Sequence, residues 1–329
     1  MVRNHRITWT HQSVQDLFEK PFFDLISQAH EIHGKHFDPS RIELCALINI
    51  KTGGCPEDCG FCHQSAHFKT GLDREALMDV ESVVQKAKKL KHLGVQRCCL
   101  GAAWRTPPKK DFPRVIEMIR HVKALGFETC VTLGFLDQQQ ANQLKDAGLD
   151  YYNHNIETSP EFYANVVSTH SFQDRLTTVQ NVSRAKINVC CGGIVGLGES
   201  REDRINFLLA LSQIKTPPKS IPINRMIRFD KTPLKDVEAL DVFEFIRTIA
   251  VTRMMFPQSM VRLSGGRKEL SESDQALCFY AGANSIFVGD KLLTAQNQSF
   301  DSDMFLMKRL NLEPVRPAYV TGETDVFSA

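Results

Sequence analysis

Eight short β-rich runs alternate with longer amphipathic stretches in this 329-residue chain, and no other sequence feature restricts the fold as strongly. The runs cover residues 46–53, 96–102, 128–134, 149–157, 186–195, 220–227, 259–266 and 285–292. Several of the helix-like stretches between them, such as 79–94 and 112–126, end at a glycine, as helix C-termini often do. Eight such units predict an α/β chain folded as a (β/α)8 barrel of the TIM type.

An open doubly wound sheet is the alternative fold. Such a sheet more often carries a G-x-G-x-x-G fingerprint after its first strand, and the first run here is not followed by one. Residues 11–36 have a helical pattern. We therefore expect an N-terminal helical arm over 1–40, the barrel over 41–312 and a loosely ordered tail over 313–329.

Composition excludes several classes of partner. The formal net charge is +2, so the overall field favours neither nucleic acid nor a membrane surface. No window approaches the roughly 18 apolar residues that span a bilayer, and we expect a cytoplasmic protein. In a reducing compartment, ten cysteines point to metal or redox chemistry rather than to disulfides.

The alternation of side chains along each predicted strand separates an outer from an inner face. The outer face packs on helices and is apolar, so Cys98 and Cys191 point outward, and we assign them to helix packing together with Cys45 and Cys278. The inner set is Arg97, Cys99, Cys130, Asn153, Asn155, Glu157, Cys190, Asn224 and Arg262.

That inner set is unlike the branched aliphatic layers of a structural barrel. One buried cysteine is most simply a small hydrophobe. Three of them beside two arginines, which are costly to bury without partners, instead predict thiolates that hold a metal cluster. The guanidinium groups would offset the negative charge of the cluster.

Cys55, Cys59 and Cys62 form a C-x3-C-x2-C loop after the first run, at the barrel end where active sites form. A structural zinc site would need a fourth ligand, which His63 or His67 could supply. A disulfide with one spare thiol is a further alternative. Three thiolates on a four-iron cluster leave one iron open for a small molecule, and we favour this interpretation.

The C-x3-C-x2-C spacing, with Phe61 before its last cysteine, resembles that of the radical S-adenosylmethionine (SAM) superfamily. The resemblance implies that SAM chelates the open iron and is cleaved by an electron from the cluster to a 5′-deoxyadenosyl radical. Residues 192–199, GGIVGLGE, are similar to a G-x-I-x-G-x-x-E pattern that lines the adenine site in these enzymes. This match implicates Gly192, Ile194 and Gly196, although a glycine-rich turn alone is more often only a turn.

Stretches spread over residues 40–312 resemble the biotin synthase family in the same order, among them CPEDCGFCHQS, YYNHNIETSPEFY, CCGGIVGLGES and CFYAGANSIFVGDKLLT. The resemblance implies a sulfurtransferase that converts dethiobiotin to biotin. It implies SAM cleavage at a [4Fe-4S] cluster on Cys55, Cys59 and Cys62, and sulfur from a [2Fe-2S] cluster on Cys99, Cys130, Cys190 and Arg262.

The same resemblance assigns contacts with SAM or dethiobiotin to Asn153, Asn155, Glu157 and Arg175, and places Asn224 at the substrate. It also implies a flavodoxin- or ferredoxin-type electron donor and a homodimer. Arginine is an unusual iron ligand, because its guanidinium stays protonated and has no free lone pair. From the residues alone, Arg262 is better explained as a buried counter-charge, and only the resemblance favours its binding to iron.

The chain departs from the family pattern at four positions. Glu157 stands where the family usually has aspartate, and Gly60, Phe61 and His63 replace lysine, tyrosine and proline. We expect His63 to be a solvated loop residue. The alternatives to biotin synthase are another radical SAM barrel enzyme, for rearrangement or cofactor maturation, and a non-catalytic iron–sulfur or zinc protein.

Overall fold

Strands and helices alternate along the chain in the computed structural model, which describes residues 8–315. The strands are β1 (Arg41–Lys51), β2 (Arg97–Ala102), β3 (Glu128–Thr132), β4 (Tyr151–Asn153), β5 (Asn188–Cys190), β6 (Gly193–Val195), β7 (Ser220–Arg225), β8 (Met260–Leu263), β9 (Ser285–Phe287), β10 (Lys291–Leu292), β11 (Ala295–Gln296) and β12 (Glu313–Pro314). The α-helices are α1 (His11–Glu19), α2 (Phe22–His36), α3 (Val80–His92), α4 (Phe112–Ala124), α5 (Gln138–Asp146), α6 (Phe172–Arg184), α7 (Arg201–Gln213), α8 (Val242–Met255), α9 (Glu272–Tyr280) and α10 (Phe300–Arg309). Short 3-10 helices cover Tyr163–Asn165 and Arg267–Glu269.

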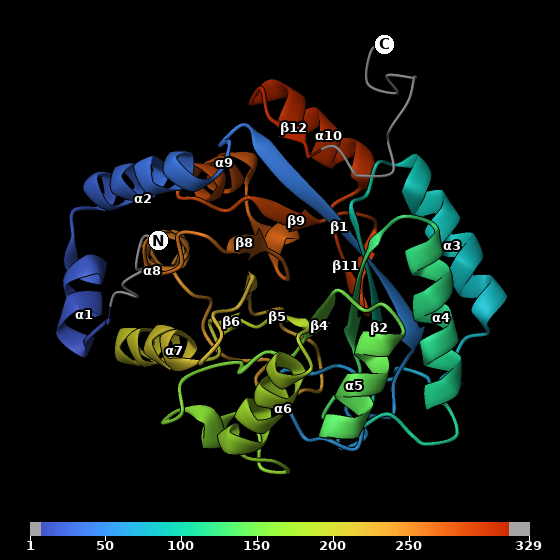
Figure 1. The fold of residues 1–329 in the computed structure, drawn as a ribbon. Coiled ribbons are helices and arrows are strands. Elements are labelled where there is room, and N and C mark those ends of the chain that lie inside the picture. Colours follow the sequence, from blue (N-terminus) through green and yellow to red (C-terminus); the bar gives the residue numbers. More distant parts are fainter. Residues whose placement is uncertain (1–7, 316–329) are drawn as a thin grey trace.

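Within the described residues, the parallel strands close into a barrel of eight positions. The order is β1-β2-β3-β4-β5-β7-β8-β9, β6 continues the fifth position beside β7, and β9 pairs with β1. The helices surround the strands (Figure 1). The predicted (β/α)8 barrel is therefore confirmed, and the open sheet is excluded by the β9–β1 pairing.

Local sequence explains where the helices begin and end. Asp137, Ser171 and Ser200 precede α5, α6 and α7, and each side chain accepts a hydrogen bond from a backbone N–H in the first turn. Gly126 and Gly148 follow α4 and α5 with φ of 95° and 92°, a conformation that costs glycine little. These capping residues let each helix stop before the next strand.

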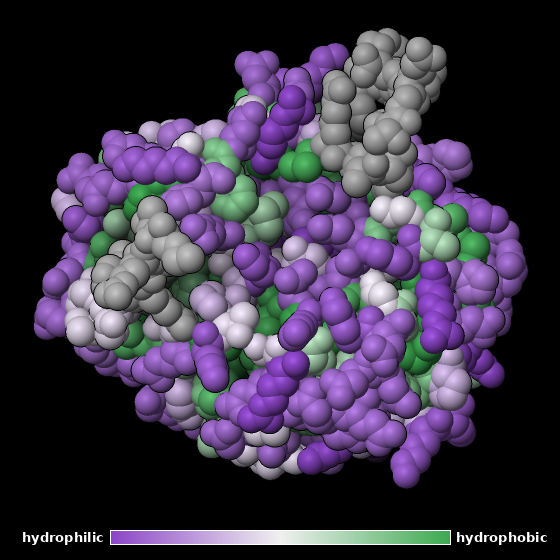
Figure 2. Space-filling model, in the orientation of Figure 1, coloured by the Kyte–Doolittle hydropathy of each residue, from purple (hydrophilic) through white to green (hydrophobic). Residues whose placement is uncertain are grey.

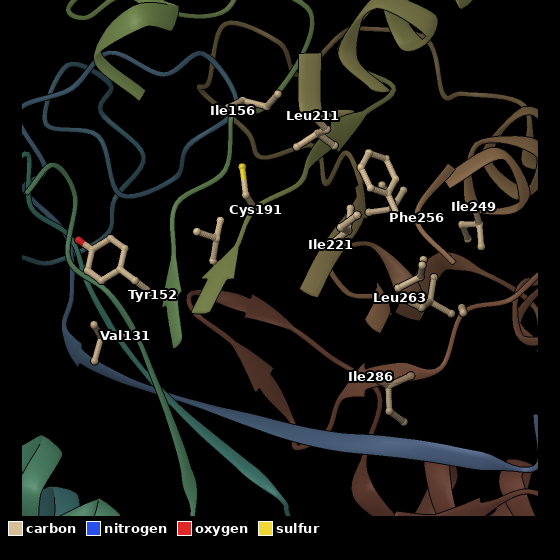
Figure 3. Close-up of a cluster of buried hydrophobic side chains, with 14 of the residues drawn as sticks. Val131, Tyr152, Ile156, Cys191, Leu211, Ile221, Ile249, Phe256, Leu263 and Ile286 are labelled. Carbon is tan, nitrogen blue, oxygen red and sulfur yellow. The ribbon is translucent and has the colours of Figure 1, made fainter. Parts of the chain in front are cut away.

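The main hydrophobic core lies between the strands and the surrounding helices. Figure 3 shows part of it, with Cys191 among side chains such as Ile221 and Leu263. Cys98 and Cys278 belong to the same core and are fully buried. The assignment of these three cysteines to helix packing is confirmed.

Most of the strands are shorter than the predicted runs, and two runs differ most clearly. β4 covers only Tyr151–Asn153, and the run 186–195 is divided into β5 and β6. The division falls at Gly192, where a Cβ would lie only 2.0 Å from the backbone oxygen of Pro222. This close approach requires glycine and interrupts the regular strand.

Both ends of the described chain pack on the barrel. Arg247 on α8 donates from Nη1 to the backbone oxygens of Phe18 (3.1 Å) and Lys20 (2.6 Å), which ties the predicted N-terminal helices to the body. β12 adds a parallel strand to the start of β1, so the predicted tail begins inside the sheet. The rest of that tail, 316–329, lies outside the described residues.

Hydrophilic side chains cover most of the face of the molecule seen in Figure 2. Among residues 8–315, no helix combines the length and the apolar character needed to cross a membrane.

Candidate functional site

A cavity of about 130 Å³ lies inside the barrel, on the side of the strands' carboxyl ends. Its walls come from β1, β2, β3, β4, β7, β8 and β9 and from the segment that follows β9. Six of the residues predicted to face inward line it: Cys99, Cys130, Asn153, Asn155, Asn224 and Arg262. Because active sites of such barrels form at this end, the cavity is the candidate site.

Three thiols meet at the inner end of this site. Cys99 on β2 is paired in register with Cys130 on β3. On the next pair of strands, Asn153 on β4 is paired in register with Cys190 on β5. A hydrogen bond from Cys130 lowers the pKa of Cys190 to about 5, and the positive charge of Arg262 acts in the same direction against burial. A thiolate is the form of cysteine that binds metals, so the inner face is prepared for a metal group.

Arg262 is fully buried beside these thiols. Its Nη1 donates to Cys190 Sγ at 3.8 Å, its Nε to Ser285 Oγ at 2.9 Å, and its Nη2 to Cys45 Sγ at 3.1 Å. The guanidinium therefore has neighbours on every nitrogen, and it touches two thiols.

The assignment of Cys45 to helix packing is wrong, because this thiol faces the barrel interior. The predicted first run begins at residue 46, so Cys45 lies outside it and the alternation of strand faces does not predict the side to which this thiol points. β1 in fact begins at Arg41, and its inner face carries Glu43 and Cys45 as well as Leu47, which lines the cavity.

Glu43 is an inward-facing charged residue that sequence reasoning missed. Its Oε1 lies 2.6 Å from Arg97 Nη2 and its Oε2 lies 3.2 Å from Arg262 Nη2, while Ser285 donates to Oε2 at 2.5 Å. Burial opposes the ionisation of Glu43, but the two arginines outweigh it and lower its pKa. One carboxylate thus binds both inward-facing arginines. The only sequence signal for this role is the presence of an acidic residue within a largely apolar strand.

Replacing Glu43 with glutamine is expected to lower the free energy of unfolding by about 3–5 kcal/mol, because Arg97 and Arg262 would lose their shared buried anion. Denaturant unfolding of the apoprotein measures the change. Glu128→Gln is the matched control: Glu128 also pairs with Arg97, at 2.9 Å, but its side chain is 38% exposed. The control should cost at most about 1 kcal/mol. Equal losses from the two variants would contradict the role of Glu43.

Cys55, Cys59 and Cys62 lie in the loop after β1, and backbone hydrogen bonds define its shape. Cys55 N–H donates to Gln64 O at 2.9 Å, and Cys62 N–H donates to Cys59 O at 2.8 Å. Burial raises the pKa of all three thiols, that of Cys62 to about 11. They become thiolates readily only beside a strong positive charge such as a metal group supplies.

Two acidic residues inside the cysteine motif anchor this loop to residues 168–170. Glu57 Oε2 lies 2.5 Å from His170 Nδ1, and Glu57 Oε1 lies 2.7 Å from Arg105. Asp58 Oδ1 accepts from the backbone N–H of Ser168 at 3.0 Å. Burial opposes the ionisation of Asp58, but this and further hydrogen bonds lower its pKa well below the usual range.

The two histidines considered as zinc ligands are engaged elsewhere. His63 stacks on Phe229 with ring centroids 4.6 Å apart, and its Nδ1 lies 3.3 Å from Thr294 Oγ1. His67 Nε2 lies 3.0 Å from Pro56 O. His63 is half-buried rather than solvated as expected, because this ring stack covers it.

In the part of the chain from residue 8 to residue 315, no three His, Cys, Asp or Glu side chains are arranged to hold a single metal ion. A cluster requires a wider arrangement, because each thiolate binds a different iron. Cys59 and Cys62 interact electrostatically with each other and with Cys55, so the three thiols do share one site.

Glu157 and Arg175 lie next to the cysteine loop. Arg175 Nη1 lies 3.3 Å from Glu157 Oε1, and Arg175 Nε donates to Tyr163 Oη at 2.9 Å. Burial raises the pKa of Glu157. Glu157 Oε2 is buried and has no hydrogen-bond partner in the described chain, so it is an acceptor suited to a hydroxyl of a bound molecule.

Glu157 has a φ of 69°, which is rare for a residue other than glycine. Its carbonyl accepts from Ile194 N–H at 2.8 Å, in an isolated bridge to Gly193. This conformation sends the carboxylate toward Arg175, and strained backbone of this kind is common at functional sites.

The glycine-rich segment 192–199 contains β6 and the tight turn that follows it. Glu199 accepts hydrogen bonds from the N–H groups of Gly196 (2.9 Å) and Leu197 (2.6 Å). Gly196 has a φ of 88°. Ile194 and Phe61 pack on the same small apolar cluster, which joins this turn to the cysteine loop.

The three predicted asparagines are held by specific hydrogen bonds. Asn153 Nδ2 donates to Asn155 Oδ1 at 3.1 Å, and Asn155 Oδ1 also accepts from Gly192 N–H at 3.2 Å. Asn224 bridges Gly193 O and Gly265 N–H, each at 2.9 Å. The amides are therefore fixed in place around the cavity.

Comparison with family models divides the chain into two parts. Residues 49–211 match the radical SAM superfamily, and residues 222–313 match the biotin and thiamin synthesis associated domain. Both predicted cysteine sets lie within the first match, and Arg262 lies within the second.

Curated relatives cover nearly the whole chain. A biotin synthase of Coxiella burnetii (strain RSA 493 / Nine Mile phase I) is 58% identical over 305 residues, which is 93% of this chain and 95% of the relative. A biotin synthase of Escherichia coli (strain SE11) is 51% identical over 321 residues, 98% of this chain and 93% of the relative.

Two solved structures share the fold. Methylornithine synthase has a TM-score of 0.80 at 21% identity, covering 94% of this chain and 95% of the other. The FeFe-hydrogenase maturase of Carboxydothermus hydrogenoformans has a TM-score of 0.81 at 17% identity, covering 94% and 76%. At these identities the likeness establishes the barrel alone.

Proposed function

Because this chain belongs to the biotin synthase family, its reaction is the conversion of dethiobiotin to biotin, and we propose how its residues divide that reaction between two cluster sites. The family implies SAM, a [4Fe-4S] cluster and a [2Fe-2S] cluster as cofactors. Identity of 51–58% over almost the entire chain favours this activity over another radical SAM reaction or a non-catalytic role.

Cys55, Cys59 and Cys62 are the proposed ligands of the outer, [4Fe-4S] cluster. The support is their shared site on one loop and the absence of a fourth thiol on that loop, which leaves one iron open for SAM. The carboxylates of Glu57 and Asp58 keep the loop in place through residues 168–170.

SAM is proposed to lie between the cysteine loop and the glycine-rich turn. The unpartnered Oε2 of Glu157 suits a ribose hydroxyl, and the longer side chain of glutamate still reaches this place because Arg175 holds its other oxygen. Asn155 lies beside this pair, and Arg175 Nη1 donates to its backbone oxygen at 3.2 Å. The part of the site that contacts the adenine ring of SAM would be formed by Phe61, Gly192, Ile194 and Gly196.

A Gly193→Ala substitution tests this position for SAM. The new Cβ would lie 2.3 Å from Glu157 O and 2.7 Å from Phe207 Cε2, so the bridge that holds Glu157 must open. We expect a loss of about 1–3 kcal/mol of stability and SAM binding at least about tenfold weaker. Denaturant unfolding and equilibrium SAM binding measure the two effects.

Gly34→Ala is the control for that substitution. Its Cβ would meet only Pro39 Cγ, at an ordinary 3.6 Å, within helix α2. Alanine should stabilise this helix by about 0.5–1 kcal/mol and leave SAM binding unchanged. If Gly193→Ala bound SAM with wild-type affinity, the glycine-rich turn would not be part of the SAM site.

The inner, [2Fe-2S] cluster is proposed to be surrounded by Cys99, Cys130, Cys190 and Arg262. The low pKa of Cys190 and the buried, unpartnered Nη1 of Arg97 fit an anionic metal–sulfide group at this depth. When bound, the two clusters supply the electron that cleaves SAM and the sulfur that enters the substrate. The chain's own part is to hold the thiolates, offset their charge and exclude water.

Dethiobiotin is proposed to occupy the 130 Å³ cavity between the two sites. The amides of Asn153, Asn155 and Asn224 offer both donors and acceptors, which suits a ureido ring. The apolar part of the lining suits a hydrocarbon chain, and includes Leu47, Phe287, Leu292 and Leu293. A closed barrel also keeps a reactive radical away from solvent.

Three features of the setting are proposed as well. A flavodoxin- or ferredoxin-type donor would reach the outer cluster at the loop, where Pro56 is exposed and Cys55 and Cys62 are partly exposed. A homodimer rests on the family resemblance alone, and a cytoplasmic location rests on ten cysteines of which none is paired in a disulfide.

The observation that carries the proposal is a cavity lined by two of the inner thiols, Cys99 and Cys130, together with Arg262 and the three asparagines. The test is anaerobic reconstitution with iron and sulfide, followed by incubation with SAM, a reductant and dethiobiotin. We expect 5′-deoxyadenosine and biotin together. Formation of 5′-deoxyadenosine without any biotin, from protein that holds both clusters, would refute the assignment of substrate.

A further inference from the structure

We propose that Cys45 is an alternate ligand of the inner cluster, held in reserve behind Arg262. The proposal rests on the assignment of Cys99, Cys130 and Cys190 to that cluster. It adds a fourth thiol, from β1, to a site for which the family resemblance names three.

The geometry supports this role directly. Arg262 Nη2 lies 3.1 Å from Cys45 Sγ, and Arg262 Nη1 lies 3.8 Å from Cys190 Sγ. The two thiols therefore contact two nitrogens of the same planar group. Only the width of one guanidinium separates Cys45 from Cys190.

Cys45 is also free to change partners. It is fully buried, but it does not belong to the hydrophobic core that contains Cys98, Cys191 and Cys278. Its other contacts are long: Glu43 Oε2 at 3.4 Å and Ser285 Oγ at 3.7 Å. A thiol hydrogen bond of this kind is weak, so little is lost when the sulfur turns toward iron.

Arg262 is what keeps Cys45 from the cluster. The ion pair with Glu43 at 3.2 Å and the hydrogen bond to Ser285 at 2.9 Å fix the guanidinium between the thiols. Iron–sulfur clusters prefer thiolate ligands, whereas a guanidinium has no free lone pair. Removal of the guanidinium therefore opens the space that Cys45 would need and leaves the better donor facing it.

The test compares Arg262→Ala and Cys45→Ser with the double variants Arg262→Ala/Cys45→Ser and Arg262→Ala/Cys98→Ser after anaerobic reconstitution. Iron and sulfide per chain are measured together with the visible circular dichroism spectrum, and outer-cluster function is checked by 5′-deoxyadenosine formation. We expect Arg262→Ala to keep the inner cluster with a changed spectrum. The Cys45 double variant should lose it, and the Cys98 double variant, which removes a buried thiol on the helix side, should resemble Arg262→Ala.

Retention of the same spectrum and iron content in the Cys45 double variant would overturn the proposal. Loss of the inner cluster already in Arg262→Ala would overturn it too, and so would loss in Cys45→Ser alone, because Cys45 would then be a resident ligand. If Arg262→Ala does not fold, Arg262→Val, which also removes the guanidinium and is too short to fill its place beside Cys45, replaces it throughout. Failure of the inner-cluster assignment itself is recognised separately, as full cluster content in Cys130→Ala.

Discussion

Cys62→Ala is expected to abolish both products, 5′-deoxyadenosine and biotin. Cys62 is one of only three thiols on the loop after β1, and the nearest histidines, His63 and His67, are held by other partners. A cluster left with two protein ligands would not be retained, and no electron would reach SAM. Anaerobic reconstitution, iron analysis and chromatography of both products give the readout.

Cys98→Ala is the control for this loss. It also removes a fully buried thiol, but from the helix side of β2. It should reduce stability modestly, by about 1–2 kcal/mol, and keep both products. Undiminished 5′-deoxyadenosine formation in Cys62→Ala would exclude the C-x3-C-x2-C loop as the cluster site.

Cys130→Ala is expected to separate the two activities. It should abolish biotin formation but still permit some cleavage of SAM, because the cysteine loop, Glu157 and Arg175 keep all their contacts. Cys130 lies between the other two inner thiols and hydrogen-bonds to both Cys99 and Cys190. Loss of the Cys130 thiol therefore removes the central member of the three inner thiols.

The measurement for Cys130→Ala is the ratio of biotin to 5′-deoxyadenosine in one reaction, with Cys191→Ala as control. Cys191 adjoins Cys190 in sequence but points into the helix-facing core (Figure 3). The control should keep the wild-type ratio. An undiminished biotin yield from Cys130→Ala would remove the sulfur-donor role from the inner thiols.

Much of the candidate site could be predicted from the two-residue period of side chains along a strand. Side chains in a strand alternate between faces, so a regular strand reveals which cysteines meet inside a barrel. Cys99, Cys130 and Cys190 were separated in this way from Cys98 and Cys191, and the structure agrees for all five. The rule failed for Cys45 because it depends on knowing where a strand begins. β1 extends back to Arg41 through its pairing with β9 and β12, and those partners are far away in sequence.

The contacts that sequence reasoning missed are those made by pairs distant in sequence. Glu43 meets Arg262 across 219 positions, and Glu57 meets His170 across 113. Nothing in the local pattern around either carboxylate identifies its partner. The positive φ of Glu157 is likewise imposed by its bridge to Gly193, not by its own preference.

The sequence by itself determined the barrel, the cysteine loop and the inward-facing thiols, because helix and strand periods and ligand spacing are local properties of the chain. Only the tertiary structure decided that Cys45 and Glu43 surround Arg262, that His63 and His67 are occupied elsewhere, and that one cavity is lined by Cys99, Cys130, Arg262 and the three asparagines. The physical reason is that barrel closure brings β1 against β9, so that Glu43, near the start of the chain, balances the buried charge of Arg262, which lies 219 positions away.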